Sequence, residues 1–246
     1  MQTVHLKNIK KQGYTMKESL RALKTNIQFC GDDNRVILIT SSIPNEGKST
    51  VSFELARSLT ESGKKVLLID TDMRKSVLVG RLRAVAEKGE IKGLSHYLSG
   101  MNKMEDVVYV TDIDRLFMVF AGPSVPNPTE ILEKVYFKEL IEFGRKFFDY
   151  VLVDCAPIGA AIDAAVVAKQ CDGAVLVVGQ GMAKARMLKG VLKQLEASGV
   201  RILGVVLNKV KMNKKGYGYG YRYGYGYGYG YGYGSAYGSY GNESEE

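Results

Sequence analysis

The amino-acid sequence predicts a three-layer α/β fold, in which helices cover both faces of a mainly parallel central sheet. Several short runs rich in Val, Ile and Leu are apolar throughout, as strands buried on both faces are. Segments with the apolar spacing of helices separate these runs, and a helix between two strands usually makes a parallel connection. The length of 246 residues accommodates one such domain with appendages.

The predicted elements alternate along the chain. Strands are expected at residues 36–40, 65–70, 115–121, 149–154, 173–178 and 202–207. Helices are expected at residues 49–62, 129–146 and 182–198, and Gly63 supplies a stop signal for the first. Ligands of such folds bind at the carboxyl ends of strands, so the segments after residues 40, 69 and 153 are the candidate sites.

Composition divides the chain into an N-terminal arm at residues 1–35, a core at 36–210 and a tail at 211–246. Eleven of the 16 tyrosines and eleven of the 28 glycines lie between Gly216 and Gly241. A strand with glycine at alternate positions has little to pack, so this composition predicts a flexible, disordered tail. A low-complexity linker or a sticky aromatic segment is the alternative interpretation of the tail.

Composition also excludes several classes of protein. The three cysteines form no C-x-x-C pair, and an odd number argues against a disulfide framework. Two histidines are too few for a usual zinc site. No apolar run approaches the ~18 residues that span a bilayer, and residues 1–11 lack the apolar region of a secretory signal. These features predict a cytoplasmic protein.

The formal net charge of +8 is unevenly distributed. Residues 1–35 hold seven Lys/Arg and three acidic residues, a balance of about +4. A basic arm suits nucleic acid, an anionic membrane surface or an acidic partner, and it is equally compatible with a solvated helix face. No helix-turn-helix or RNA-binding signature is present, so no nucleic-acid partner is expected.

The first candidate site is a phosphate-binding loop. Residues 42–49 nearly match G-x-x-x-x-G-K-[ST] and lie between a predicted strand and a predicted helix, with Ser42 in place of the first glycine. Serine fits this position if its φ stays negative. Backbone N–H groups of such a loop surround phosphates, Lys48 adds a positive charge, and the Ser49 hydroxyl can bind Mg²⁺. The motif predicts a P-loop NTPase that uses ATP and Mg²⁺.

Carboxylates follow two further strands. The strand at 65–70 ends in Asp70 and is followed by Asp72 and Arg74. The strand at 149–154 ends in Asp154. In P-loop proteins such aspartates orient Mg²⁺ and its water shell. If the extended backbone continues to Asp72, both carboxylates of the D-x-D pair share a face. The alternative is that Asp72 caps a turn and pairs with Arg74.

Together these segments resemble a known family. Residues 42–50, 67–74 and 152–157 resemble the Walker A, A′ and B motifs of the bacterial tyrosine kinases, and D-x-D-x-R distinguishes that family from most P-loop proteins. The stretches at 93–100 and 122–132 and the tail are also similar, so the resemblance covers essentially the whole chain. The most similar members are stand-alone cytoplasmic kinases of Gram-positive bacteria that regulate capsular or exopolysaccharide synthesis.

The resemblance implies an ATP-dependent autokinase and assigns roles to residues. The expected catalytic residues are Lys48, Asp70, Asp72 and Asp154, with Ser49, Asp70 and Asp154 holding the metal. One of the D-x-D carboxylates would take the tyrosine proton. The expected nucleotide-binding residues are Pro44, Asn45, Glu46, Gly47, Lys48, Ser49, Thr50, Arg74 and Asn208, the last of them at the adenine.

Members of the family end in a tyrosine cluster that one subunit phosphorylates in another. Tyrosine has a pKa near 10, so its proton must leave as the new bond forms. The expected autophosphorylation sites are Tyr217, Tyr219, Tyr221, Tyr223, Tyr225, Tyr227, Tyr229, Tyr231, Tyr233, Tyr237 and Tyr240.

The family resemblance also implies partners. An E-x-x-R-x-x-R motif mediates ring-like oligomerisation in the family, and here Glu18, Arg21 and Lys24 occupy it. Lysine keeps the charge of the last position but loses bidentate pairing, and a simple surface ion pair is the local alternative. A membrane activator would recruit the protein through its cytoplasmic tail to the inner face of the plasma membrane, and a tyrosine phosphatase would oppose it.

Two other functions share the core motifs. A spatial-regulator ATPase of the MinD/ParA kind has the same fold, but usually carries a second lysine where this chain has Ile43. A non-catalytic ATP-binding scaffold could use the aromatic tail to recruit enzymes of polymer synthesis.

Overall fold

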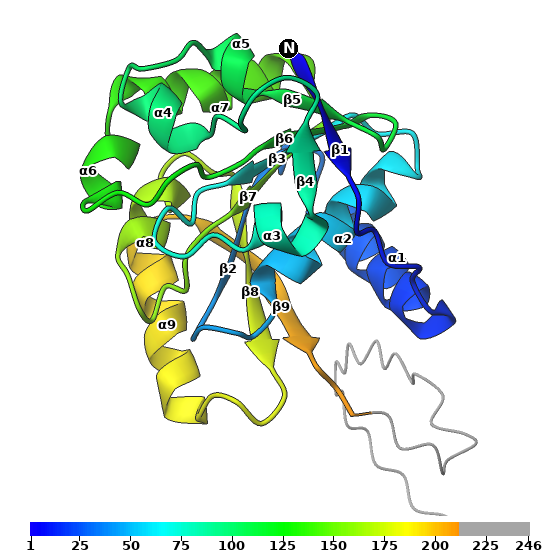
Figure 1. Cartoon of the computed structure of the whole chain (residues 1–246). Helices are drawn as coiled ribbons and strands as arrows, with labels where there is room; N and C mark the ends of the chain where they lie inside the picture. The colour runs from blue at the N-terminus through cyan, green and yellow to red at the C-terminus, as the bar shows by residue number, and fades with distance from the viewer. Residues whose placement is uncertain (212–246) are drawn as a thin grey trace, which may run out of the picture. The chain divides into compact units, whose positions relative to one another are not determined.

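The computed structural model describes residues 1–211 of the chain. The tail and its tyrosines at positions 217–240 therefore lie outside the described residues. Residues 1–210 form one compact unit, which includes the predicted N-terminal arm. The described residues contain nine strands in one sheet, in the order β4-β1-β5-β6-β3-β7-β2-β8-β9 (Figure 1).

Six parallel strands form most of the sheet and confirm the six predicted strands. They are β6 (Leu116–Val119), β3 (Val66–Asp70), β7 (Tyr150–Asp154), β2 (Val36–Ser41), β8 (Gly173–Gly179) and β9 (Arg201–Asn208). Every residue of β2, β3 and β8 is buried, which explains why these sequences do not alternate.

The sequence did not reveal the three strands at the other side of the sheet. They are β1 (Gln2–Leu6), β4 (Ala84–Ala86) and β5 (Tyr109–Thr111). β1 pairs antiparallel with β4, and β5 pairs antiparallel with β6, so the sheet is mixed at this side. Val4 is fully buried. The first residues of the chain are thus part of the sheet.

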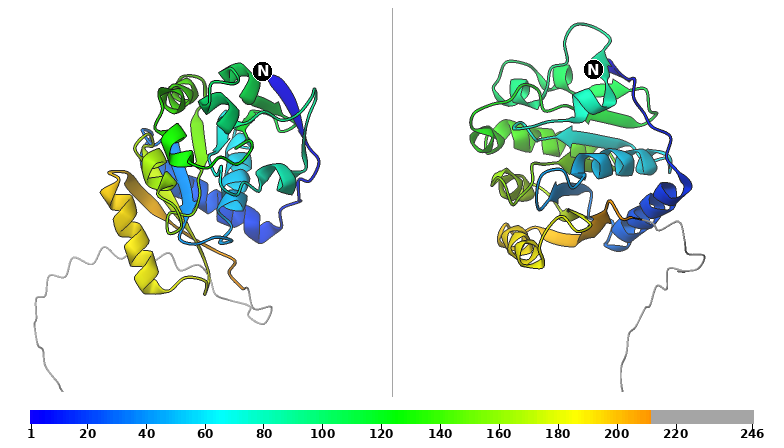
Figure 2. Two further views of the ribbon diagram at one scale, coloured as in Figure 1. Left: turned by 60° about the vertical axis from the view of Figure 1, so that its left-hand side comes forward. Right: turned by 60° about the horizontal axis from the view of Figure 1, so that its bottom comes forward.

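Helices cover both faces, as predicted, and the right-hand view of Figure 2 shows the two layers. One core contains Leu67 and Ile69 of β3, and the other contains the alternate residues Val66 and Leu68. The second core is covered by α1 (Tyr14–Phe29), α2 (Lys48–Thr60) and α3 (Leu78–Leu82). The first core is covered by α4 (Leu94–Leu98), α5 (Met104–Val107), α6 (Pro128–Leu132), α7 (Val135–Phe147), α8 (Asp163–Ala168) and α9 (Ala185–Ala197).

Two predicted helices differ from the structure. The helix predicted at 129–146 is two helices, because Lys134 has extended backbone (φ −68°, ψ 157°) and separates α6 from α7. The helix predicted at 182–198 begins only at Ala185, because Lys184 is also extended. No helix among residues 1–211 is long and apolar enough to cross a membrane.

Candidate active site

The predicted site residues converge at the carboxyl ends of β2, β3 and β7. In the parallel ladder Asp70 lies directly beside Asp154, although the two are 84 positions apart in sequence. A pocket of ≈ 670 Å³ opens at this edge of the sheet. Its lining residues are Pro44, Asn45, Gly47, Lys48, Ser49, Thr50, Asp72, Arg74, Lys75, Val77, Arg81, Ala156, Pro157, Ala160, Ala161, Asn208 and Lys209.

The loop between β2 and α2 is organised around Glu46. Its buried carboxylate accepts hydrogen bonds from the backbone N–H groups of Ser42 (2.7 Å), Ile43 (2.9 Å) and Gly179 (3.0 Å), and from the Ser42 hydroxyl (2.7 Å). Glu46 is absent from the pocket lining. The carboxylate is turned inward to hold the loop, so the predicted contact of Glu46 with the nucleotide would involve its backbone.

The backbone of this loop explains the substitution at its first position. Positive φ values occur at Asn45 (68°) and Gly47 (96°) but not at Ser42, so serine is accommodated there without strain. Gly47 is also constrained from outside, since a Cβ would lie 2.2 Å from Nδ2 of Asn208. That amide donates a hydrogen bond to the Glu46 carbonyl (2.8 Å), which places Asn208 at the mouth of the pocket.

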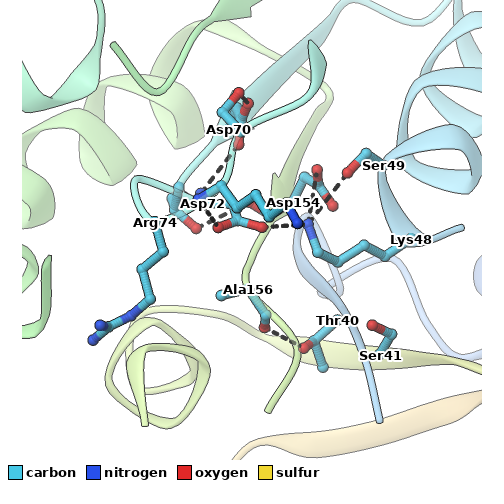
Figure 3. A network of polar contacts seen from close by, with 12 residues as sticks. Thr40, Ser41, Lys48, Ser49, Asp70, Asp72, Arg74, Asp154 and Ala156 are labelled. Atoms are coloured by element: carbon cyan, nitrogen blue, oxygen red, sulfur yellow. Dashed lines mark hydrogen bonds and ion pairs between the residues drawn. The ribbon is translucent and has the colours of Figure 1, made fainter. Parts of the chain in front are cut away.

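Lys48 is held between carboxylates (Figure 3). Its Nζ lies 2.9 Å from Oδ2 of Asp72 and 3.6 Å from Oδ2 of Asp154, and donates a hydrogen bond to Oγ of Ser49 (3.2 Å). Burial alone lowers the pKa of Lys48, but the charges of Asp154 and Asp72 outweigh burial and raise it above the ordinary value. Lys48 is therefore a charged lysine that can move from carboxylates to phosphates.

Asp70 and Asp154 are both buried. Burial, followed by the charge of Asp154, raises the pKa of Asp70 to about 7, although Asp70 accepts hydrogen bonds from the Ser76 hydroxyl (2.6 Å) and the Asp72 N–H (3.0 Å). Burial also raises the pKa of Asp154, and Lys48 partly opposes this rise.

One oxygen at the site has no hydrogen-bond partner. Oδ1 of Asp154 accepts from the Ser52 hydroxyl (3.2 Å), whereas the buried Oδ2 accepts no hydrogen bond. A carboxylate oxygen in this state fits a divalent cation or a water bound to it. No cluster of three His, Cys, Asp or Glu side chains suited to a metal occurs within residues 1–211. Mg²⁺ keeps several waters and takes phosphate oxygens, so it suits such a sparse donor set.

Asp72 lies beyond the end of its strand. β3 ends at Asp70, and Oδ1 of Asp72 accepts the Lys75 N–H (3.0 Å), as a turn-capping residue does. The expectation that the strand continues to Asp72 is thus wrong. The alternative is right about the turn and wrong about the partner, because Asp72 pairs with Lys48 and not with Arg74.

Arg74 instead joins two residues that the sequence analysis missed. Its guanidinium donates to both carboxylate oxygens of Asp163 (2.7 and 3.0 Å), and the Thr129 hydroxyl donates to the same carboxylate (2.6 Å). Burial opposes ionisation of Asp163, but the hydrogen bonds from Arg74 and Thr129 and the charge of Arg74 together outweigh burial and lower the pKa of Asp163. The only local signal was the N-P-T stretch at residues 127–129.

The remaining predictions concern surfaces. Glu18, Arg21 and Lys24 all lie on α1, where Arg21 donates to Glu18 (2.7 Å) and Lys24 contacts the Ser62 hydroxyl of the same chain. The structure thus places the three predicted oligomerisation residues on one helix, outside the lining of the pocket.

Comparisons with known proteins agree with this geometry. Residues 37–217 match the family model of the CobQ/CobB/MinD/ParA nucleotide binding domain. The tyrosine-protein kinase CpsD of Streptococcus agalactiae is 43% identical over 85% of this chain and 90% of its own length. The tyrosine-protein kinase YwqD of Bacillus subtilis is 34% identical over 82% of this chain and 85% of its own length. The chain belongs to the bacterial protein-tyrosine kinases.

The solved structures place this kinase in the same group. The kinase domain of the Escherichia coli tyrosine kinase ETK superposes with a TM-score of 0.75 and 33% identity, covering 84% of this chain and 80% of that one. These matches confirm the predicted family, the P-loop fold and the predicted enzyme class.

Proposed function

We propose that the kinase transfers the γ-phosphoryl group of ATP to tyrosines 217–240 of a second copy of itself. The observation that carries the proposal is the position of Lys48, which a phosphate-binding loop holds between two carboxylates at the mouth of a nucleotide-sized pocket. Phosphoryl transfer depends mainly on position and on charge stabilisation, and this arrangement supplies both.

Nucleotide binding exchanges the partners of Lys48. The N–H groups at the start of α2 face the phosphates, and Lys48 leaves Asp72 for the β- and γ-phosphates. Thr50 would contact the α-phosphate and Asn208 the adenine, and both line the pocket together with Pro44, Asn45 and Arg74. Glu46 contributes by holding the loop.

The site also suits Mg²⁺. Ser49 and Asp154 would hold the ion, and Asp70, adjacent to Asp154 in the ladder, would hold its water shell. When bound there, Mg²⁺ neutralises part of the charge that develops on the transferring phosphates.

The transfer breaks the bond between the γ-phosphorus and the oxygen that bridges it to the β-phosphate, and forms a bond to the tyrosine oxygen. The phenolic proton must leave that oxygen. We assign the proton to Asp72, because Asp72 lines the pocket and is released when Lys48 moves to the phosphates, whereas Asp70 does not line it. Asp70 positions Asp72, because its carboxylate accepts a hydrogen bond from the backbone N–H of Asp72.

The family resemblance supports a cellular role for this reaction. We propose that the kinase regulates capsular or exopolysaccharide synthesis and export, assembles into a ring through α1, and is activated by the cytoplasmic tail of a membrane protein. This activator would hold the kinase at the inner face of the membrane, and a tyrosine phosphatase would reverse the modification.

Mapping phosphotyrosine by mass spectrometry after incubation with Mg-ATP tests the proposal. The wild type, Lys48→Met and the control Lys193→Met, an exposed lysine on α9, are compared with and without candidate activator peptides. Phosphates confined to residues 217–240, and absent only from Lys48→Met, are expected. ATP turnover without phosphotyrosine in any condition would instead indicate a MinD/ParA-like regulator. A Lys48→Met chain that still supports polysaccharide output would indicate a scaffold.

A further inference from the structure

A second pocket adjoins the nucleotide pocket. It has a volume of ≈ 580 Å³ and lies between the segment after β1, the first turns of α2, and α3. The two pockets share Ser49, Thr50 and Arg81, and Arg81 contacts the Thr50 hydroxyl at their boundary. We name this second pocket the cationic groove. It is lined by Asn8, Lys10, Ser49, Thr50, Phe53, Glu54, Leu78, Gly80, Arg81, Leu82 and Arg83.

The cationic groove carries three exposed cations that lack acidic partners. Lys10, Arg81 and Arg83 form no ion pair with any carboxylate of residues 1–211. The one carboxylate of the groove, Glu54, is already occupied by Arg57 (2.9 Å) and by the Gln12 amide. The groove therefore has an unneutralised positive charge beside the nucleotide pocket.

The backbone presents these cations in a defined place. Asn8 donates through its side chain to the Arg81 carbonyl (2.7 Å) and through its N–H to the Leu82 carbonyl (3.0 Å). Arg83 has a positive φ of 47° at the end of α3, which directs the chain from α3 into β4. Asn8 follows β1, and Arg83 lies between α3 and β4, so these hydrogen bonds tie the segment that carries Lys10 to the segment that carries Arg81 and Arg83.

An anion with several carboxylates fits such a groove, because guanidinium groups pair with carboxylates through two hydrogen bonds. The chain itself contains this partner. Between Gly216 and Gly241 the tail is mostly Tyr and Gly, and all the acidic residues of the tail, Glu243, Glu245 and Glu246, lie in the segment 242–246. Charge complementarity thus pairs the cationic groove with that segment.

We propose that the cationic groove docks the acidic segment 242–246 of a second copy and so presents its tyrosines to the adjacent pocket. This inference rests on the proposed function. Three residues of extended chain span at most about 11 Å, so docking at Glu243 brings Tyr240 to the neighbouring site and Tyr237 next. The tail is then phosphorylated in order, from Tyr240 toward Tyr217.

Kinetics in trans test the docking. The enzyme chain has its eleven tail tyrosines replaced by phenylalanine, and the substrate chain is Lys48→Met, so that phosphate moves only between copies. Initial rates and the order of modification are compared for substrates with the native tail and with Glu243→Gln/Glu245→Gln/Glu246→Gln. We expect the neutral tail to raise KM about tenfold with kcat unchanged, and to abolish the order. The effect should shrink in high salt.

Charge-reversal variants of the enzyme test the same contact from the side of the cationic groove. Lys10→Glu/Arg83→Glu should raise KM for the native tail to a similar extent and regain activity on a tail with Glu243→Lys/Glu245→Lys/Glu246→Lys. The matched control is Arg186→Glu/Lys189→Glu on exposed positions of α9, which should change nothing. The substrate-side arm does not depend on the folding of these enzyme variants.

The outcomes separate the two proposals. No phosphate on the native tail would contradict the proposed function itself. Normal transfer with equal KM and equal order for the native and neutral tails would overturn the docking alone. A rise in the KM for ATP with no change for the tail in Lys10→Glu/Arg83→Glu would assign these cations to the nucleotide and also overturn it.

Discussion

The two edges of the sheet use aspartates in opposite ways. At the amino edge, Asp149 and Asp172 directly precede β7 and β8. Each accepts a hydrogen bond from a backbone N–H at the start of an adjacent strand: Lys65 donates to Asp149 (2.7 Å), and Val36 donates to Asp172 (2.7 Å). At the carboxyl edge, the buried carboxylates of Asp70 and Asp154 are neighbours in the ladder, and Oδ2 of Asp154 accepts no hydrogen bond.

The electrostatics follow this difference. Burial opposes ionisation of Asp172, but the hydrogen bonds from Arg145, Val36 and Arg35 and the charge of Arg145 together outweigh burial and lower the pKa of Asp172. The pKa values of Asp70 and Asp154 are raised, first by burial. The amino edge therefore stabilises the fold, whereas burial at the carboxyl edge disfavours the ionised carboxylates, which is typical of functional sites.

The largest effect is expected for Asp154→Asn at the carboxyl edge. We expect kcat for tyrosine phosphorylation to fall about 10²–10³-fold, because Asp154 loses the charge with which Oδ2, which accepts no hydrogen bond, would hold the metal. Thermal unfolding of the free chain should be unchanged or shifted upward. A variant with full activity would contradict the assignment of Asp154.

The matched change at the amino edge is Asp172→Asn. We expect a loss of about 2 kcal/mol in the free energy of unfolding at pH 7, because N–H groups and Arg145 lose a charged acceptor. The pKa of Asp172 is lowered in the fold, so its stabilisation is present above its ordinary value and is lost as pH falls through the lowered one. Urea unfolding at pH 7 and pH 3 measures this, and a loss of equal size at both would contradict it.

The variant Asp163→Asn tests the carboxylate that holds Arg74 beside the nucleotide pocket. Because Asp163 orients Arg74 without lining the pocket, we expect kcat to fall about tenfold while Thr129→Ala, which removes one hydrogen bond, has a smaller effect. Steady-state kinetics with ATP and the tail measure both. If Asp163 were only structural, kcat would stay normal while the unfolding temperature fell.

The smallest expected effect is in the pH dependence of Asp70→Asn. The folded pKa of Asp70 is about 7, above its ordinary value, so its contribution to stability is full at low pH and is lost as pH rises toward 7. Asparagine does not titrate. The unfolding temperature of Asp70→Asn should therefore match the wild type near pH 4 and exceed it by about 3–8 °C at pH 8. A difference that is constant with pH would contradict the raised pKa.

Much of the fold could be predicted because its centre is encoded locally. β2, β3 and β8 are buried along their whole length, so their residues form continuous apolar runs. β4 and β5 have three residues each with mixed burial, and such segments carry no recognisable period. Their pairing depends on contacts with β1 and β6.

The candidate site likewise has features that local sequence predicts and features that depend on tertiary contacts. The phosphate-binding loop, Lys48 and the aspartates at strand ends could be found from local sequence, because each motif lies within one turn or one strand end. The partners of these residues depend on contacts between distant segments: Asp72 for Lys48, Asp163 for Arg74, and the inward direction of Glu46. Arg74 and Asp163 are 89 positions apart, and they meet because the first residue of α8 lies beside the turn that follows β3. Local periodicity specifies which elements form, whereas the packing of those elements specifies which charges meet.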